Sequence, residues 1–465
     1  MLRLVLPLGL ACALAGAACG RTALLPIPFG FYGAGGSDGE GGAGGIGGAG
    51  GIGGAGGTGG TGGTGGAGGT GGTGGTGGAG GQPTDWPCPI TVTPTVGVDG
   101  GGTFAQRQPR LAYTSADGQQ VTVAMEWLMP GNAAPSELRH VTFSPWGQWP
   151  AAPLDLSFRA SFDAGVSFAI SRAPSSKFAL LMSDGGKPTD PDGMLFTPSM
   201  TPKSGDVPSP QVIDEAELAQ FLSLRDSRLL VGVANRDGSQ PAAVRTLTLS
   251  GNNFALGTRW PLGCGSDSSA DVVVAGSGWL VAAAGTDSSF GATNCGGSIG
   301  MPLDRLFLAT VDTALGKPAL ATTLTASGAI AQVVLEVRAG ASPWIAWRDP
   351  SGVYAARLDA TAGTVASGPF LVPAALADRS FAALPFLDGL LLVHATTGAV
   401  GAEGLTYVWP DGLLSSTEVP PGLVGLAAFD ALPAPKAKDT AGLVSFVRSA
   451  SPDRIELARV ACGAQ

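Results

Sequence analysis

The chain is poor in histidine, and this shortage narrows the chemistry it can perform. Its 465 residues include two histidines, His140 and His394. So few histidines make a histidine-based metal centre or a Ser-His-Asp triad hard to assemble. Both lie within or at the end of short apolar runs, so we interpret them as structural side chains. The sequence therefore predicts a protein that is not an enzyme.

Charged residues are scarce as well, and positive charge is the scarcer kind. Asp, Glu, Lys and Arg make up 13% of the chain, with 26 basic against 35 acidic residues and a net charge of -9. A negative protein is not steered towards nucleic acid or an anionic membrane face. We expect no nucleic-acid partner and a monomeric protein.

Helical periodicity is nearly absent. Only residues 213–222 place apolar side chains at helical spacing, and an irregular loop fits that segment equally well. The remainder carries short β-branched or aromatic runs separated by Gly, Pro, Asp and Ser, which is the pattern of strands and turns. The sequence therefore predicts an all-β fold.

These short runs recur with a period of roughly 50 residues, which is the signature of a repeat architecture. The second run of each repeat occurs at 121–127, 178–182, 229–235, 279–284, 344–347, 390–394 and 443–447. Another short run precedes it, as at 110–114 and 272–275, and a third run follows it. Seven repeats of three or four strands predict a single seven-bladed β-propeller over residues 83–465. The last repeat lacks an outer strand, and residues 88–96 alternate apolar with polar side chains. We expect this segment to be an N-terminal edge strand that closes the ring.

The first residues form an export signal. Arg3 precedes an apolar stretch that ends in small residues, which is typical of a secretory signal peptide over residues 1–18. The segment Leu14-Ala15-Gly16-Ala17-Ala18-Cys19 resembles the bacterial lipobox, although Gly16 stands where that family usually has Leu. The resemblance implies lipidation of Cys19 and a membrane partner through the lipid. Ordinary cleavage after Ala15-Gly16-Ala17 is the alternative.

The cysteine count is consistent with the lipobox. Removing Cys12 and acylating Cys19 leaves four cysteines, an even number in an oxidising compartment, and four free buried thiols are the alternative. If the edge strand pairs antiparallel with the last strand, Cys88 lies beside Cys462. Cys264 and Cys295 then fall in two loops on the same face of the propeller. We therefore predict the pairs Cys88–Cys462 and Cys264–Cys295.

A glycine tract separates the leader from the repeats. Thirteen Gly-Gly-X triplets run from Gly41 to Ala79, with X only Ala, Ile or Thr. Without proline this composition cannot form a collagen helix, and it offers almost no side chain to pack. We interpret residues 19–82 as a lipidated Cys19 followed by a disordered tether.

The candidate ligand-binding residues lie in loops that the repeat places on one face. Acidic residues follow the second strand of four repeats, two of them next to an arginine, and one connection is long and carries a cysteine. The predicted rim comprises Asp184, Arg236, Asp237, Asp287, Phe290, Asn294, Arg348 and Asp349. An Asp at these positions also begins turns by bonding its own backbone.

One of these loops is also a weak candidate for calcium. Asp184, Asp190 and Asp192 lie in a glycine- and proline-containing segment, but it lacks the alternating Asp pattern and the terminal Glu of a calcium loop. We therefore expect no cofactor, with calcium at this segment as the alternative.

The segment Cys19-Gly20-Arg21-Thr22-Ala23-Leu24-Leu25, followed by the glycine triplets, resembles Gly-rich-tethered lipoproteins of the kind found in myxobacteria. No specific propeller family is matched. The likeness implies a lipid-anchored envelope protein, at the outer membrane or cell surface rather than on the inner membrane. We predict a binding or adhesion module for a protein or glycan ligand. The alternatives are a propeller enzyme, such as a lyase or glycoside hydrolase acting on a surface polymer, and an assembly scaffold.

Overall fold

The computed structural model describes residues 86–463 with internal gaps. The gaps are 100–104, 129–135, 156, 163–166, 173–177, 184–193, 197–216, 226–227, 236–240, 251–252, 265–268, 287–288, 296–300, 315, 339, 360, 362, 374, 376, 397–402, 419–422, 424, 437–439 and 449–452. All described residues belong to one compact unit. The predicted signal peptide, Cys19 and the glycine tether lie outside the described residues.

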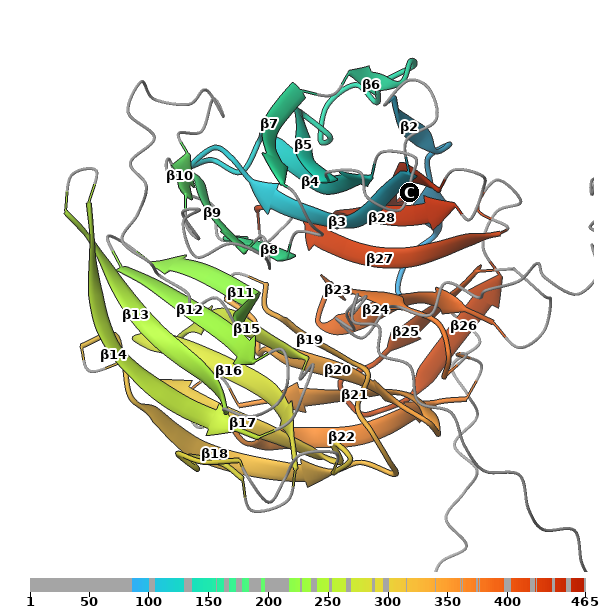
Figure 1. The fold of residues 1–465 in the computed structure, drawn as a ribbon. Coiled ribbons are helices and arrows are strands. Elements are labelled where there is room, and N and C mark those ends of the chain that lie inside the picture. The colour runs from blue at the N-terminus through green and yellow to red at the C-terminus, as the bar shows by residue number, and fades with distance from the viewer. Residues whose placement is uncertain are drawn as a thin grey trace, which may run out of the picture. The chain divides into compact units, whose positions relative to one another are not determined.

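The described residues form seven β-sheets (Figure 1). Five of these sheets have four strands each. The first two comprise β3 (Ala105–Tyr113), β4 (Val121–Leu128), β5 (Ser136–Phe143) and β7 (Ser157–Phe162), and β11 (Glu217–Arg225), β12 (Arg228–Asn235), β13 (Ala242–Ser250) and β14 (Asn253–Gly263). The other three comprise β15 (Ala270–Ala275), β16 (Gly278–Gly285), β17 (Arg305–Val311) and β18 (Pro318–Thr325); β19 (Gln332–Glu336), β20 (Trp344–Asp349), β21 (Gly352–Leu358) and β22 (Val365–Val372); and β23 (Phe381–Phe386), β24 (Gly389–Ala395), β25 (Glu403–Val408) and β26 (Leu414–Glu418).

The other two sheets differ in strand number. One has three strands, β8 (Ser167–Ile170), β9 (Phe178–Ser183) and β10 (Met194–Phe196). The other has six and joins the two ends of the described chain, with β27 (Leu426–Pro433), β28 (Ala441–Arg448) and β29 (Arg454–Cys462) beside β1 (Ile90–Val92), β2 (Val96–Asp99) and β6 (Leu154–Asp155).

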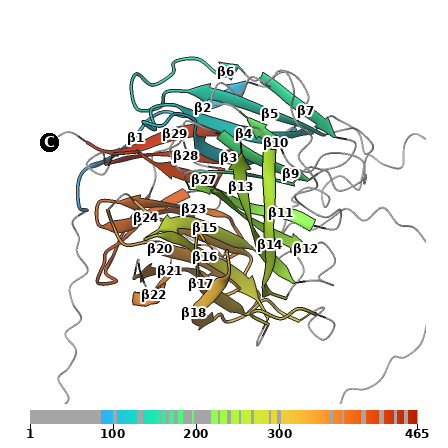
Figure 2. The same ribbon diagram turned by 90° about the vertical axis from the view of Figure 1, so that its left-hand side faces the viewer.

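The first strands of the sheets follow one another around a ring. Each contacts the first strands on either side, in the order β3, β8, β11, β15, β19, β23, β27 and back to β3. Apolar clusters fill the spaces between consecutive sheets; Leu384 and Phe446, for example, share one cluster between the sheets that begin with β23 and β27. Figure 2 shows the sheets side by side in a second view. The predicted all-β propeller fold is confirmed.

The ends of the chain close this ring. Strand β1 pairs antiparallel with β29, so that Ile90 lies opposite Cys462 and Val92 opposite Val460. Cys88 is bonded to Cys462, and the bridge spans a sequence separation of 374 residues. Strand β2 continues the pairing further along β29 and then pairs with β6. The predicted edge strand and its disulfide are therefore confirmed.

One detail departs from the expectations. The segment 213–222, expected to be a helix or a loop, contributes instead to strand β11 from Glu217 onwards, because Phe221 and Leu222 fill apolar clusters on opposite sides of that strand. The sheet β8–β10 has three short described strands where the repeat predicts three or four. No helix that is long and apolar enough to cross a membrane occurs among the described residues.

Candidate functional site

The structure describes half of the predicted rim residues. Phe290, Asn294, Arg348 and Asp349 are described. Asp184, Arg236, Asp237 and Asp287 lie outside the described residues, as do Asp190 and Asp192 of the candidate calcium loop. No group of three metal-ligating side chains that could hold a metal ion occurs in the described part of the chain.

Arg348 and Asp349 are buried and hold the backbone of neighbouring loops. The Asp349 carboxylate accepts hydrogen bonds from the backbone N–H of Ser327 at 2.9 Å and of Ser351 at 2.8 Å. Arg348 Nη1 donates to the carbonyl oxygen of Ala377 at 3.0 Å. Burial lowers the pKa of Arg348 to about 10, opposed by the charge of Asp378. Their geometry is that of turn residues, and their ligand-binding role stays a prediction.

The long connection between β16 and β17 is fastened at its base. Cys264 is bonded to Cys295 as predicted, at a sequence separation of 31. The backbone N–H of Thr286 donates to the carbonyl of Cys264 at 3.1 Å. Phe290 packs edge-on against Phe307 with 5.6 Å between ring centroids. The Phe290 ring is therefore partly covered by the sheet that carries this connection.

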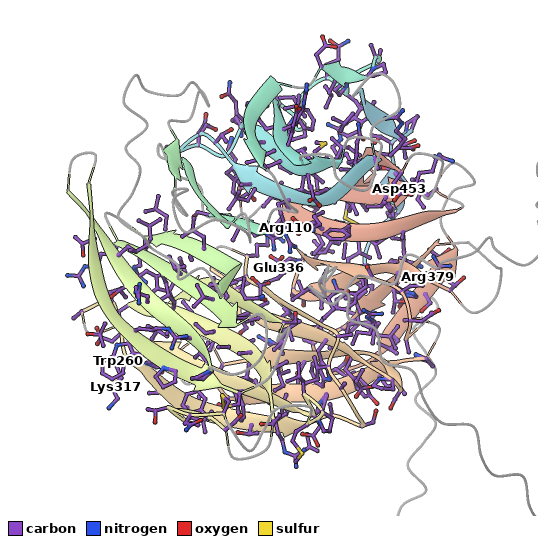
Figure 3. The ribbon with its side chains drawn as sticks, in the orientation of Figure 1. Arg110, Trp260, Lys317, Glu336, Arg379 and Asp453 are labelled. Atoms are coloured by element: carbon purple, nitrogen blue, oxygen red, sulfur yellow. A yellow bond between two sulfur atoms is a disulfide. The ribbon has the colours of Figure 1, made fainter. Side chains whose placement is uncertain are left out.

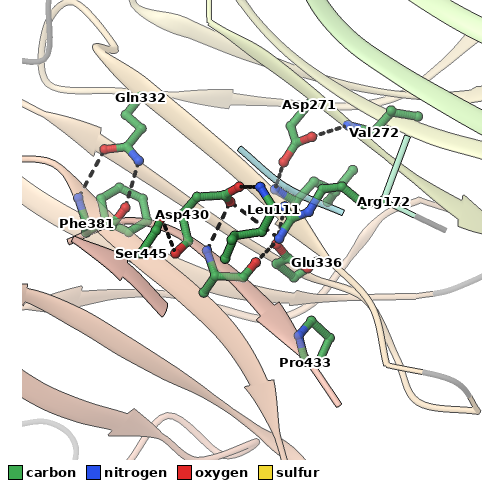
Figure 4. Close-up of polar contacts among 12 residues, drawn as sticks. Leu111, Arg172, Asp271, Val272, Gln332, Glu336, Phe381, Asp430, Pro433 and Ser445 are labelled. Atoms are coloured by element: carbon green, nitrogen blue, oxygen red, sulfur yellow. Dashed lines mark hydrogen bonds and ion pairs between the residues drawn. The ribbon is translucent and has the colours of Figure 1, made fainter. Parts of the chain in front are cut away.

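A cluster of charged side chains lies at the centre of the ring, and the sequence reading did not identify it. Arg172, just after β8, forms an ion pair with Glu336 of β19 at 2.5 Å and with Asp430 of β27 at 3.5 Å (Figure 4). Its Nη2 also donates to the carbonyl oxygen of Ala431. Because β8, β19 and β27 belong to three sheets that do not follow one another in the ring, this arginine connects sheets across the centre.

Two carboxylates of this cluster join consecutive first strands. Asp430 accepts a hydrogen bond from the backbone N–H of Leu111 in β3 at 2.8 Å. Asp271 of β15 accepts one from the N–H of Leu335 in β19, also at 2.8 Å. Each also accepts from the N–H of the residue that follows it, at 3.0 Å and 2.8 Å respectively. The same arrangement of an aspartate bonded to two backbone N–H groups therefore occurs twice in the ring.

Gln332 joins a further pair of first strands through its side-chain amide. It donates to the carbonyl of Phe381 at 2.8 Å and accepts from the Phe381 N–H at 3.2 Å, thereby linking β19 to β23. Polar side chains thus replace the ladder hydrogen bonds that neighbouring first strands do not make.

Burial and mutual charge shift the proton affinities of this cluster. Burial raises the pKa of Glu336 to about 8, against the opposing charge of Arg172. Burial likewise raises the pKa of Asp271. Burial lowers the pKa of Arg172, but Asp430, Glu336 and Asp271 together outweigh it and hold that pKa above its ordinary value. The cluster is therefore a strongly coupled network around one guanidinium.

A second arginine lies at the centre without such a network. Arg110 of β3 is partly exposed, and its guanidinium carbon lies 5.5 Å from the ring centroid of Phe429 in β27. Burial lowers the pKa of Arg110, although the charges of Asp430 and Asp271 oppose this. Figure 3 shows Arg110 and Glu336 near the centre, with Arg379 at the periphery.

The sequence does contain a signal for these residues. Each of the central charges interrupts or borders an apolar run, as Arg110 does before Leu111 and Asp271 does before Val272. Arg110 and Asp271 lie on first strands, whereas the residues predicted as the rim lie at the ends of second strands or after them.

Comparison with known proteins shows no family. No family model matches the sequence, and no curated protein matches it. A structure of unknown function from Dyadobacter fermentans is 12% identical with a TM-score of 0.46, covering 80% of this chain and 99% of its own. One from Desulfotomaculum acetoxidans, also functionally unknown, is 11% identical with a TM-score of 0.40, covering 70% and 87%. A β-1,3-galactosidase of glycoside hydrolase family GH43 is 11% identical with a TM-score of 0.29, covering 51% and 54%. Likeness at this level carries no argument about function.

Proposed function

We propose that the chain is an exported, lipid-anchored propeller that binds an envelope ligand on the side of the sheets facing away from its anchor. The observation that carries this proposal is the position of the two disulfides, which mark opposite ends of the strands. Both disulfides are typical of an oxidising compartment outside the cytoplasm.

The two ends are identified from chain direction. Hydrogen bonds join Ser269 to Val333 and Asp271 to Leu335, so the first strands β15 and β19 run parallel. Cys264 precedes β15, and Cys295 lies between the second and third strands of that sheet. Both therefore lie where first strands begin, which we call the binding side.

Cys462 lies at the other end. It closes β29, the third strand of its antiparallel sheet, on the side where the first strand β27 ends. Cys88 is bonded to it there. We call this the anchor side, because the leader and tether join the propeller at Cys88. A tether of about 60 residues has a mean reach of roughly 40 to 45 Å, enough to hold the binding side away from a membrane.

The proposal includes seven blades and an outer-membrane or cell-surface location. The ring of seven first strands supports the blade count. The lipobox-like sequence before Cys19 supports the anchor, and intact-mass analysis of the mature protein tests it. A diacylated Cys19 at the N-terminus is the expected result, and an unmodified N-terminus beyond Ala17 or Ala18 would contradict it.

The binding function is tested with the purified mature chain and its own cell-envelope fraction. We expect the chain to co-sediment with the envelope after its lipid has been removed enzymatically, in a saturable manner. Denatured and refolded serum albumin serves as the control for non-specific adhesion. A delipidated chain that stays in the supernatant at every concentration would contradict a binding module.

Catalysis is the second candidate, and the raised pKa of one central carboxyl, that of Glu336, favours it. Glu336 and Asp430 bind one guanidinium, so their carboxylates lie within about 8 Å, close enough for two carboxyl groups to act on one glycosidic bond. A carboxyl with a pKa of about 8 could serve as a general acid. Release of reducing sugar from an envelope polymer by the wild type, but not by Glu336→Gln, would establish it; equal release by both would exclude Glu336 as the acid.

A further inference from the structure

Arg110 differs from Arg172, the other central arginine, in having no ion pair with the described residues. Arg172 is engaged by two carboxylates and a backbone carbonyl. The guanidinium of Arg110 forms neither a hydrogen bond nor an ion pair with the described residues, and its contact is with the face of Phe429. Both Arg110 and Phe429 are partly exposed on first strands, which surround the ring centre. Within the described part of the chain, no acceptor engages the five N–H donors of this guanidinium.

The strands that carry this pair are irregular where the pair lies. The pairing of β27 with β28 slips between Ala428 and Asp430, which leaves Phe429 at a β-bulge. The pairing of β3 with β4 slips just before Arg110, and Gln108 in that irregularity has a positive φ of 50°. Bulges redirect side chains, and backbone held in sparsely populated conformations clusters at ligand sites.

The electrostatics favour one negative group and disfavour a polyanion. Burial lowers the pKa of Arg110 even though Asp430 and Asp271 act against it, so the charged guanidinium is incompletely compensated. Those two carboxylates are already bonded to backbone N–H groups of neighbouring strands. The net charge of -9 repels an extended polyanion.

We propose that Arg110, backed by Phe429, binds a single carboxylate of the ligand at the ring centre. The planar fork of the guanidinium matches a carboxylate with two parallel hydrogen bonds, and stacking on an aromatic ring fixes its orientation. A glycan that carries isolated or terminal uronic acid residues fits this chemistry. The inference rests on the binding function proposed above and names its ligand class.

Calorimetric titration of the delipidated mature chain with methyl galacturonoside, a sugar that carries one carboxylate, tests this, with the neutral methyl galactoside as the matched sugar. We expect the wild type to bind the acidic sugar and to bind the neutral one at least about tenfold more weakly. Arg110→Ala should lose about tenfold or more in affinity, and Arg110→Lys, which keeps the charge without the fork, should lose an intermediate amount. Arg379→Ala removes the same charge at the periphery and should bind as the wild type does.

The results that would contradict the carboxylate site differ from the result that would contradict the binding function. Envelope binding without methyl galacturonoside binding, or equal losses in Arg110→Ala and Arg379→Ala, would overturn the carboxylate site and leave the binding module intact. Tighter, Arg110-dependent binding of a methyl galactoside that carries one sulfate would overturn carboxylate as the ligand class. If Arg110→Ala does not give the wild-type melting temperature, Arg110→Gln and Arg110→Lys carry the comparison. No envelope binding by the wild type would overturn the binding function itself.

Discussion

At the scale of single residues, Arg172 is the side chain on which the centre of the ring depends most. It is the counter-charge of Glu336 and Asp430, whose side chains are 7% and 10% exposed. Removing one partner of a buried ion pair leaves an uncompensated buried charge. This costs far more than replacing both partners by apolar side chains. The central network is therefore expected to be sensitive to loss of this one arginine.

Replacing Arg172 by methionine tests this dependence. The variant keeps an apolar stem of similar length but, at about pH 9 where Glu336 is ionised, leaves the carboxylates without their cation, so we expect its free energy of unfolding to fall there by about 3 to 5 kcal/mol. Arg379→Met, at the periphery, should change stability by less than about 0.5 kcal/mol. Urea denaturation of both variants gives the comparison, and equal small effects would show that the network contributes little.

Glu336 makes a separate prediction about pH. Its pKa is raised from 4.5 to about 8 in the folded protein. Between these values the folded state holds a proton that the unfolded state has released, so the contribution of Glu336 to stability falls as pH rises. Asp271, whose pKa is also raised, acts in the same direction, while Arg172 and Asp430 face the same carboxyl.

We therefore expect wild-type stability to decrease between about pH 5 and about pH 9, and Glu336→Gln to lose less over that interval. Denaturant unfolding at the two pH values measures the difference. Identical losses in the two proteins would show that the Glu336 carboxyl does not titrate in this range.

At the scale of elements, the sequence predicts the second and third strands well and the first strands in part. Short runs at 110–114, 166–170, 272–275 and 333–337 coincide with β3, β8, β15 and β19. Second strands such as β16 are continuous apolar runs, buried on both faces, and their limits are visible from the turn residues around them. The first strand β11 was not recognised, because Gln220 and Ser223 interrupt its apolar residues. First strands need polar side chains at the ring centre, and this need obscures the pattern of a buried strand.

The disulfide that joins the two ends of the chain fastens β1 to β29. In the chain-entropy model, a bridge across so long a loop stabilises the folded state by about 5 kcal/mol, and one across a loop of about 30 residues by less. We expect the double variant Cys88→Ser, Cys462→Ser to lose more stability than Cys264→Ser, Cys295→Ser.

Hydrogen exchange adds a local measurement to that comparison. Loss of Cys88–Cys462 should release the amides of β1 and of the end of β29, including Val460, before any other strand of the unit. Equal protection of β1 with and without the bridge would show that strand pairing alone closes the ring.

At the scale of the whole molecule, chain direction divides the propeller into two sides, to which the proposed function assigns different tasks. Both disulfide pairs and the closing strand could be predicted from the sequence, because antiparallel order fixes which loops share a side. The central charges could not, since Arg172, Glu336 and Asp430 are far apart in the chain and belong to different repeats. Only closure of the ring brings them together.

The measurement that tests the account most directly is envelope binding by the protein blocked on one side at a time. An azide-bearing residue replaces Thr293, in the stapled connection between β16 and β17, or Ala116, in the turn between β3 and β4; both positions are exposed, at opposite ends of the strands. Each is then coupled to polyethylene glycol. The account predicts that the polymer at Thr293 abolishes envelope binding and the polymer at Ala116 leaves it unchanged. Binding lost only with the polymer at Ala116 would contradict it.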